Sequence, residues 1–498
     1  MSTRGRDVNL VDGDLLKPLL VLSTPLVLSQ LMQVGYNLAD TFWVGRLGQD
    51  AVSALSFSWP LVFLMISVGG GFTVAGTVLV AQNKGAGNED RVPHVAGQTI
   101  AFVTLVAFGF SVLGYLVAPS LLPLIGTTPG TAVHRLAVGY TRTIFLGLYF
   151  MFSFFMFQAL LRGWGDTRTP MYLMAFGVAM NVFLDPFLVL GFQGNPLFGW
   201  LGLSGLQTTL FAATGFTGFG VQGAAIATVL SRGVGAVVGL GLLFTGRVGI
   251  HLSPSDLLLR RETVRKIVRI GAPTSVEQST RALGVTAMTA LVALGGATAV
   301  GVDQAAAVAA FGIGARLNSL VFLPALGLAQ GTETIVGQNL GADKPDRARR
   351  AVFLSVGLLS AALGVVSVVA YAFADSIVSV FITGPNAAPV IAVGVSFIHI
   401  TAPTYVFLGA FRVTSGGFRG AGSTRTAMAF SILSLWVFRI PPALALIQQF
   451  GMGPEAVWWG IAFSNVVSAV VAGAWFLRGT WTDNVVTDSP GATPAADD

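Results

Sequence analysis

The chain has 498 residues; 53% of them are hydrophobic, only 10% are charged, and none is cysteine. A soluble domain has about 25% charged residues, so the composition excludes an ordinary soluble protein, and the lack of cysteine excludes disulfides and thiolate metal sites. The mean hydropathy of +0.75 predicts a membrane protein. The charged residues that give the net charge of +6 lie mainly in the loops between the apolar stretches, so this charge does not indicate nucleic-acid binding. We therefore expect the lipid bilayer, and no nucleic acid, as a partner.

Apolar stretches of about 20 residues recur along the chain, and each is long enough to cross the hydrocarbon core of a bilayer. They predict an all-α polytopic membrane protein with twelve transmembrane helices. The predicted spans lie at about 16–44, 53–82, 95–119, 134–161, 169–192, 219–246, 265–294, 306–337, 347–372, 386–412, 426–448 and 455–477.

The second half of the sequence repeats motifs of the first. Residues 80–83 (Val-Ala-Gln-Asn) return as 336–339 (Val-Gly-Gln-Asn), and 162–165 (Arg-Gly-Trp-Gly) return as 419–422 (Arg-Gly-Ala-Gly). An even number of spans in each copy predicts parallel repeats, here two pseudo-symmetric six-helix bundles of a transporter. The predicted organisation is a cytoplasmic N-terminal segment at 1–15, a first lobe at 16–246, a cytoplasmic linker at 247–264, a second lobe at 265–480 and a disordered tail at 481–498.

Lys and Arg are concentrated in alternate loops, including the linker and the loops that carry the repeated motifs. Positively charged loops stay on the cytoplasmic side of a membrane. We therefore expect a multi-pass protein of the plasma membrane with both termini in the cytoplasm. The long, uncharged, Gly-rich loop at 193–218 is predicted to face outside.

Two carboxylates lie inside predicted spans, Asp40 in the first and Asp185 in the fifth. A carboxylate at the centre of a membrane helix costs about 2.5–3.5 kcal/mol, which favours a functional role unless both lie at the water interface. Asn181 shares a helix face with Asp185, and Pro186 cannot donate a hydrogen bond to the carbonyl of Val182. These oxygens could bind Na⁺, or two neighbouring carboxylates could share a proton. The residues alone leave both alternatives open.

Other positions in the spans have weaker interpretations. Pro25 predicts a kink in the first span, either a hinge or a static bend. Glu277 and Arg281 are four residues apart with opposite charges, which predicts a structural ion pair. The chain has no phosphate-binding Gly-x-x-x-x-Gly-Lys-Ser/Thr loop. We therefore expect transport driven by an H⁺ or Na⁺ gradient. No nucleophile–base pair or metal-ligand cluster accompanies the two aspartates, so we expect no enzymatic activity and no cofactor.

The two six-span halves and four sequence segments together resemble the multidrug and toxic compound extrusion (MATE) family over about 15–480. These segments are 22–30, 40–45 (Asp-Thr-Phe-Trp-Val-Gly), the Gln-Asn motif at 80–86 and the Arg-Gly motif at 162–167. Asp40 with Asn181-x-x-x-Asp185-Pro186 is similar to the branch named for DNA-damage-inducible protein F, including its archaeal members.

The resemblance implies export of organic, often cationic, compounds by alternating access, in exchange for H⁺ or Na⁺, and we expect a monomer. It implies that the coupling ion binds in the first lobe, that Pro25 is the kinking proline, and that Tyr36 and Gln158 support the site. The ion-coupling residues that it implies, which would also be the Na⁺ ligands, are Asp40, Asn181, Asp185 and Thr228.

The repeat is asymmetric at these positions. The four residues that correspond to the ion-coupling set in the second half are Met288, Trp436, Ile440 and Phe463. The first lobe is therefore predicted to be the ion-coupled half.

The alternative function is a flippase for a lipid-linked sugar or another amphiphile. It would need a basic cavity for a phosphate, at which Arg142, Arg232, Arg281 and Arg439 converge.

Overall fold

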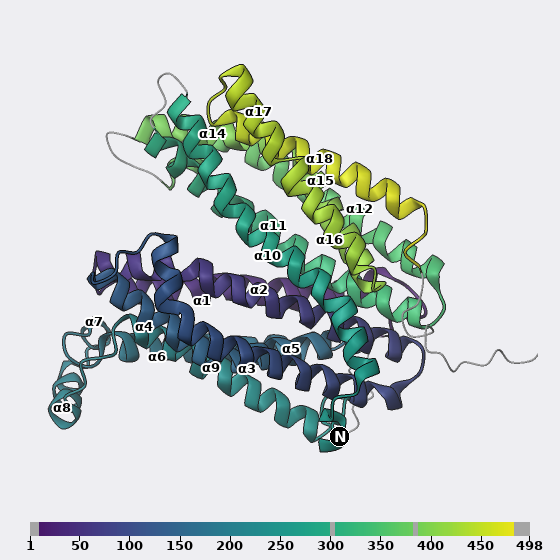
Figure 1. The fold of residues 1–498 in the computed structure, drawn as a ribbon, viewed down its shortest axis with the longest axis horizontal. Helices are drawn as coiled ribbons and strands as arrows, with labels where there is room; N and C mark the ends of the chain where they lie inside the picture. Colours follow the sequence, from purple (N-terminus) through teal and green to yellow (C-terminus); the bar gives the residue numbers. More distant parts are fainter. Residues whose placement is uncertain (1–8, 299–303, 382–386, 483–498) are drawn as a thin grey trace, which may run out of the picture. The chain divides into compact units, whose positions relative to one another are not determined.

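The computed structural model describes residues 9–298, 304–381 and 387–482, and every regular element in these ranges is helical (Figure 1). Inside a bilayer no water is available to bind backbone N–H and C=O groups, so each span must satisfy its own backbone as a helix. The helices are α1 Leu16–Gly45, α2 Gln49–Gly85, α3 Val92–Ile125, α4 Ala132–Leu146, α5 Leu148–Trp164, α6 Arg168–Leu190, α7 Pro196–Trp200, α8 Ser204–Thr214, α9 Val221–Phe244, α10 Arg261–Thr298, α11 Gln304–Gly341, α12 Pro345–Ala372, α13 Ala374–Ser379, α14 Ala387–Thr401, α15 Tyr405–Gly420, α16 Thr424–Ile432, α17 Ile440–Phe450 and α18 Glu455–Leu477.

Three short 3-10 helices, η2 Glu89–Arg91, η3 Pro254–Leu257 and η4 Ala402–Thr404, and a π-helix, η5 Leu433–Val437, complete the described helical structure. Within the described ranges, eleven helical segments are long and apolar enough to cross a membrane, and α4 with α5, bent by 49°, makes twelve if the pair is one span. The predicted all-α, twelve-helix membrane fold is therefore confirmed. The predicted external loop contains α7 and α8, which Figure 1 shows beyond the end of the long helices of their unit.

The chain forms two compact units whose limits do not coincide with the middle of the sequence. Of the described residues, unit 1 contains 28–76 and 90–268, and unit 2 contains all the others. Three helices, α1, α2 and α10, are consequently each divided between the units. The lobe, linker and terminal boundaries predicted from the repeat stay predictions, and residues 1–8 and 483–498 of the predicted end segments lie outside the described residues.

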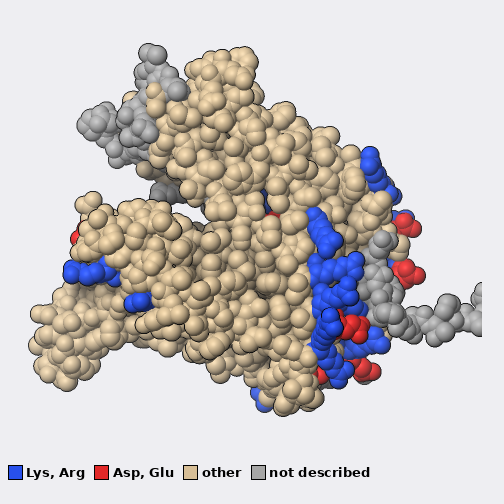
Figure 2. All heavy atoms as spheres, viewed as in Figure 1, with Lys and Arg blue, Asp and Glu red and all other residues tan. Residues whose placement is uncertain are grey.

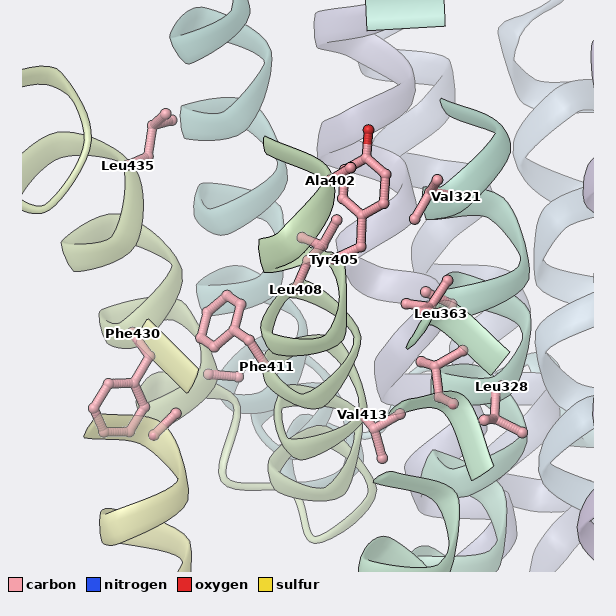
Figure 3. Packing of buried hydrophobic residues seen from close by; sticks show 14 of the residues in the cluster. Val321, Leu328, Leu363, Ala402, Tyr405, Leu408, Phe411, Val413, Phe430 and Leu435 are labelled. Atoms are coloured by element: carbon pink, nitrogen blue, oxygen red, sulfur yellow. The ribbon is translucent and has the colours of Figure 1, made fainter. Parts of the chain in front are cut away.

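The core of unit 2 is built around α15, which packs against α11, α12 and α18. Its side chains are large and apolar on the faces that meet these helices, and Tyr405, Leu408, Phe411 and Val413 point into the cluster (Figure 3). Within lipid the hydrophobic driving force between helices is missing, so tight packing of these side chains holds the helices together. Unit 2 is thus a packed helical body around one central helix.

The repeated Gln-Asn motifs pack on one another within unit 2. A Cβ atom at Gly85 would overlap the backbone of Gln338, and a Cβ atom at Gly341 would overlap the backbone of Gln82. The contact is reciprocal, as a pseudo-twofold relation between the two copies requires. Gln82 also donates a hydrogen bond to the carbonyl of Gly420, 3.3 Å away, in the second copy of the Arg-Gly motif. The repeated segments therefore act as close-packing surfaces.

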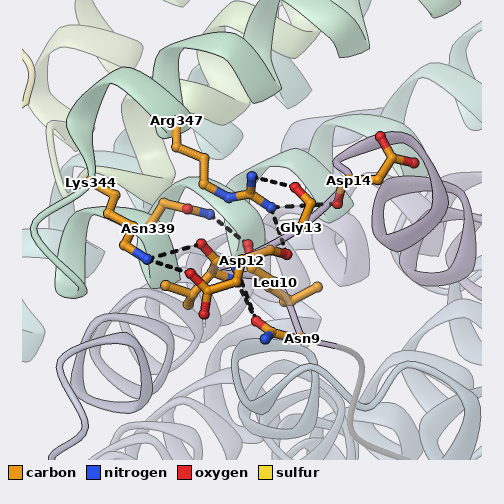
Figure 4. A network of polar contacts seen from close by, with 9 residues as sticks. Asn9, Leu10, Asp12, Gly13, Asp14, Asn339, Lys344 and Arg347 are labelled. Atoms are coloured by element: carbon orange, nitrogen blue, oxygen red, sulfur yellow. Dashed lines mark hydrogen bonds and ion pairs between the residues drawn. The ribbon is translucent and has the colours of Figure 1, made fainter.

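The segment before α1 is fastened to unit 2 by the second Gln-Asn motif and the start of α12 (Figure 4). Asn339 donates to the carbonyl of Leu10 at 3.0 Å, and Arg347 donates to the carbonyl of Gly13 at 2.7 Å. Lys344 pairs with Asp12 at 2.6 Å, and this hydrogen-bonded cation lowers the pKa of the Asp12 carboxyl. Because both partners of that pair are largely exposed, it adds little stability; the buried Leu10 side chain and Asn339 amide contribute more.

Basic side chains gather at one end of the face shown in Figure 2, where α10 begins. The exposed members at that point are Arg260, Arg261, Arg265 and Arg269. Such a band is typical of the water boundary of a membrane protein.

Replacing Asn339 with Ala is expected to destabilise the protein by about 1–3 kcal/mol, because the buried carbonyl of Leu10 loses its donor. Thermal unfolding of the purified protein in detergent measures the effect. Gln449→Ala, at an exposed position near the end of α17, is the control and should leave the melting temperature unchanged. Equal melting curves for Asn339→Ala and the wild type would refute this role of Asn339.

Candidate functional site

A cluster of polar side chains lies inside unit 1, among helices α1, α6 and α9. Helix α1 provides Tyr36 and Asp40, which are one turn apart; α6 provides Asn181 and Asp185; and α9 provides Thr228. All five are buried: Asp40 is 8% exposed, Thr228 5%, and both Asn181 and Asp185 0%. Both carboxylates are therefore buried within the protein and not exposed to water.

Hydrogen bonds join these side chains into one network. The Tyr36 hydroxyl donates to Thr228 Oγ1 at 2.5 Å, and that hydroxyl in turn faces Asp40 Oδ2 at 3.5 Å. On α6, Asn181 Nδ2 donates to Asp185 Oδ1 at 3.3 Å. The carboxyl groups of Asp40 and Asp185 lie within hydrogen-bonding reach of each other, as do Asp40 and Asn181. Four residues named from the sequence as ion-coupling residues, and Tyr36, are thus brought together.

Three buried oxygen atoms of the network have no hydrogen-bond donor among the described residues: Asp40 Oδ1, Asn181 Oδ1 and Asp185 Oδ2. Burying such an acceptor without a partner is costly. A proton on one carboxyl would make it a donor to the other, and hard cations take oxygen ligands of this kind. The arrangement can therefore hold either a proton or a small monovalent cation.

Arg232 is the member of this cluster whose role sequence reasoning missed. It lies one turn after Thr228 on α9 and is only 4% exposed. Its guanidinium donates to Gln33 Oε1 at 2.5 Å and Met174 Sδ at 2.9 Å, and lies 5.1 Å from the centre of the Tyr36 ring. Its charge also acts on Asp40. The signal available in the sequence was its spacing of four residues from Thr228.

Gln158, the other predicted supporting residue, is not part of the network. It is half-buried on α5 and makes no hydrogen bond within the described part of the chain. Pro25 lies inside α1, two residues before the point at which this helix passes from unit 2 to unit 1. Its position agrees with a bend there, and its role as a hinge stays a prediction.

The close approach of α9 to α6 sets the distance between Thr228 and Asp185. It depends on Gly223, because a Cβ atom there would overlap the carbonyl of Leu188. After Asp185, Pro186 leaves the Val182 carbonyl without its usual helix donor, and the Pro186 carbonyl accepts a hydrogen bond from Asn195 at 2.8 Å. The end of α6 is thereby held in place by the loop after it.

The predicted ion pair between Glu277 and Arg281 is wrong. In unit 2, Glu277 Oε1 instead accepts hydrogen bonds from Arg419 at 3.1 Å and from Ser431 at 2.8 Å. Arg419 also pairs with Glu333 at 3.6 Å. The partner comes from α15, a helix distant in sequence, and the several donors of its guanidinium reach both carboxylates.

A multi-pass helical membrane protein in two units, with a buried carboxylate network in one of them, is the architecture of a transporter. The family model MatE matches residues 25–187 and 281–444, one segment in each half of the sequence. Together these segments make up more than half of the chain, which therefore belongs to the MatE family. Proteins of this family are transporters and not enzymes.

Known proteins are similar to the chain along most of its length. The probable multidrug resistance protein YoeA of Bacillus subtilis is 29% identical over 454 residues, with 90% of each chain covered. A FAD transporter of Shewanella oneidensis is 26% identical over 370 residues, covering 74% of this chain and 75% of that protein. A transporter of the MOP superfamily from Pyrococcus furiosus has the same fold, with a TM-score of 0.84, 24% identity and 97% and 99% of the two chains covered.

Replacing Gly223 with Ala is expected to force α9 away from α6, to destabilise the protein by about 1–3 kcal/mol and to reduce transport. Gly241→Ala, in the same helix but facing open space, is the matched control. It should be neutral or slightly stabilising, since Ala has the higher helix propensity. Melting temperature and efflux measured on both variants test this, and a Gly223→Ala protein as stable and active as Gly241→Ala would contradict it.

Proposed function

We propose that the protein is an efflux antiporter that exchanges one external H⁺ or Na⁺ for an organic, often cationic, compound. The observation that carries the proposal is the charge of the buried network in unit 1. With both carboxylates ionised and Arg232 protonated, the network has one uncompensated negative charge. One monovalent cation neutralises it, whereas two would overcharge it. Asp40, Asn181, Asp185 and Thr228 supply the oxygens that this ion needs.

The coupling arises from competition for charge. A cationic compound near the ionised network is attracted by the same negative charge that attracts the ion. When the ion binds, this attraction is lost and the compound is released. Return of the ion to the cytoplasm restores the charge.

Helix α1 connects the ion to the rest of the fold. Asp40 and Tyr36 lie on the part of α1 that belongs to unit 1, whereas Pro25 lies on the part that belongs to unit 2. A change in the contacts of Asp40 on ion binding therefore acts on a helix that can bend at Pro25, where the backbone hydrogen-bond ladder is interrupted. We propose this bend as the step that reshapes unit 1. We further propose that the protein belongs to the branch named for DNA-damage-inducible protein F and is a monomer. It would lie in the plasma membrane with both termini in the cytoplasm.

Two observations bear on the substrate. The relative named as a FAD transporter favours a second candidate, a flavin nucleotide or another phosphorylated compound. The flippase alternative asks for a basic cavity lined by Arg142, Arg232, Arg281 and Arg439. Within unit 1, Arg142 binds the Tyr115 carbonyl at 3.1 Å and Arg232 belongs to the acidic network. We therefore keep efflux as the proposed function.

Replacing Asp40 or Asp185 with Asn is expected to lower efflux at least about tenfold, because the neutral amide removes the charge difference between ion-bound and ion-free states. Drug resistance and dye efflux in cells without their own pumps measure the effect. Asp50→Asn, at an exposed carboxylate in the first turn of α2, is the control and should keep full activity. Undiminished efflux by both the Asp40→Asn and the Asp185→Asn variant would refute the ion-coupling role of these carboxylates.

The coupling ion is identified by transport into proteoliposomes with a pH gradient alone and then a Na⁺ gradient alone. Only one gradient is expected to drive the wild type, and neither should drive the two Asn variants. Asn181→Ala adds an independent test. Na⁺ needs the amide oxygen as a ligand, so a Na⁺-driven protein should need about tenfold more Na⁺, whereas proton-driven transport should persist. Equal transport without any gradient would contradict antiport.

A further inference from the structure

The interior of unit 2 contains more arginines than carboxylates. Two acidic side chains of the described residues are buried there, Glu277 and Glu333. Four arginines of the same unit interact with one another or with Glu277 through their charges: Arg281, Arg412, Arg419 and Arg439. The group therefore has an excess of two positive charges. Burying a cation among membrane helices is expensive unless an anion accompanies it.

Two of the four arginines have protein partners. Arg419 forms ion pairs with both carboxylates, with Glu277 at 3.1 Å and with Glu333 at 3.6 Å. Arg439 donates to the hydroxyl of Ser464 at 2.8 Å and the amide oxygen of Asn465 at 3.2 Å. These neutral partners satisfy its donors but leave its charge unbalanced.

The other two, Arg281 on α10 and Arg412 on α15, converge on one aromatic ring. Their guanidinium carbons lie 4.9 and 4.6 Å from the centre of the Phe322 ring on α11. The two charges are thus no farther apart than the sum of these distances. Neither guanidinium has a hydrogen bond or an ion pair in the described part of the chain, and Arg412 Nε is buried without a partner. Their like charges repel each other, and Glu277, the carboxylate that attracts both, is already bound by Arg419.

We propose that Arg281 and Arg412 form a binding site in unit 2 for the carboxylate or phosphate group of an organic anion or zwitterion. Guanidinium forks match the oxygen geometry of both groups and can bind them in bidentate fashion. Phe322 fixes the positions of both cations through its ring face and offers apolar surface to the organic part of the ligand. Both arginines and Phe322 are only half-buried, so a ligand can reach the free donors.

This site shares no residue with the ion-coupling network, because all its residues belong to unit 2. It extends the substrate class of the proposed transporter to compounds with an acidic group. The inference does not depend on ion coupling, and binding in detergent without a gradient tests it alone.

The test measures binding of 5-carboxyfluorescein to the purified full-length protein by fluorescence anisotropy, with the cationic dye ethidium as a second probe. We expect Arg281→Gln and Arg412→Gln each to weaken carboxyfluorescein binding by about ten- to hundredfold and not to weaken ethidium binding. The matched control is Arg142→Gln in unit 1, an arginine of similar burial that also lies over a ring, 4.7 Å from the centre of Tyr115. It should bind both probes like the wild type.

A wild type that does not bind the anionic probe, or glutamine variants that bind it as tightly as the wild type, would overturn the proposal. Should those variants fail to fold, the wild type alone is labelled with phenylglyoxal, with and without carboxyfluorescein, and digested. Protection of Arg281 and Arg412 but not Arg142 supports the site, and absence of protection refutes it. Displacement of the probe by phosphatidylglycerol in mixed micelles would assign the site to a lipid headgroup, whereas displacement by inorganic phosphate but not by the lipid would assign it to a soluble anion.

Discussion

A charged side chain among membrane helices has no water to solvate it, so its charge must be balanced by a protein group or by something that binds and leaves. The helical fold satisfies the backbone and leaves the side-chain charges as the remaining cost. Unit 1 balances part of the charge of Asp40 and Asp185 with Arg232, and unit 2 balances Glu277 and Glu333 with Arg419. In each unit, the charge that no protein group balances would be balanced by a bound ion or substrate.

The two units leave opposite charges uncompensated. With both carboxylates ionised and Arg232 protonated, unit 1 has one negative charge beside three oxygens that have no donor among the described residues. Unit 2 keeps two positive charges, and two of its guanidiniums have no acceptor in the described part of the chain. The two halves share a scaffold in which Gly85 and Gly341 pack reciprocally, while their interior charges differ. A small cation and an organic acid group would then be handled by different copies of the same helical plan.

Composition and the spacing of residues along a helix were enough to predict the helical architecture and the two interior carboxylates, whereas Tyr36 and Thr228 were predicted from the family resemblance. The length of the apolar stretches located the spans, and the isolated carboxylates Asp40 and Asp185 identified the polar network. Contacts between distant helices could not be obtained in this way. Glu277 was assigned to Arg281, four residues away, but the guanidinium of Arg419 reaches it from another helix. Likewise the partners of Arg232, Gln33 and Met174, come from other helices, and Gln158 shares a unit with the network without contacting it.

The division of α1, α2 and α10 between the units bears on how such a protein could have arisen and whether it can be taken apart. Residues 9–27 and 77–89 come from the first half of the gene but fold with the second. A gene cut at the repeat boundary would yield two polypeptides, of which the second would lack the segments that complete its own body. The two halves of the sequence are therefore joined by packing as well as by the peptide chain, because segments of the first half complete the body formed mainly by the second.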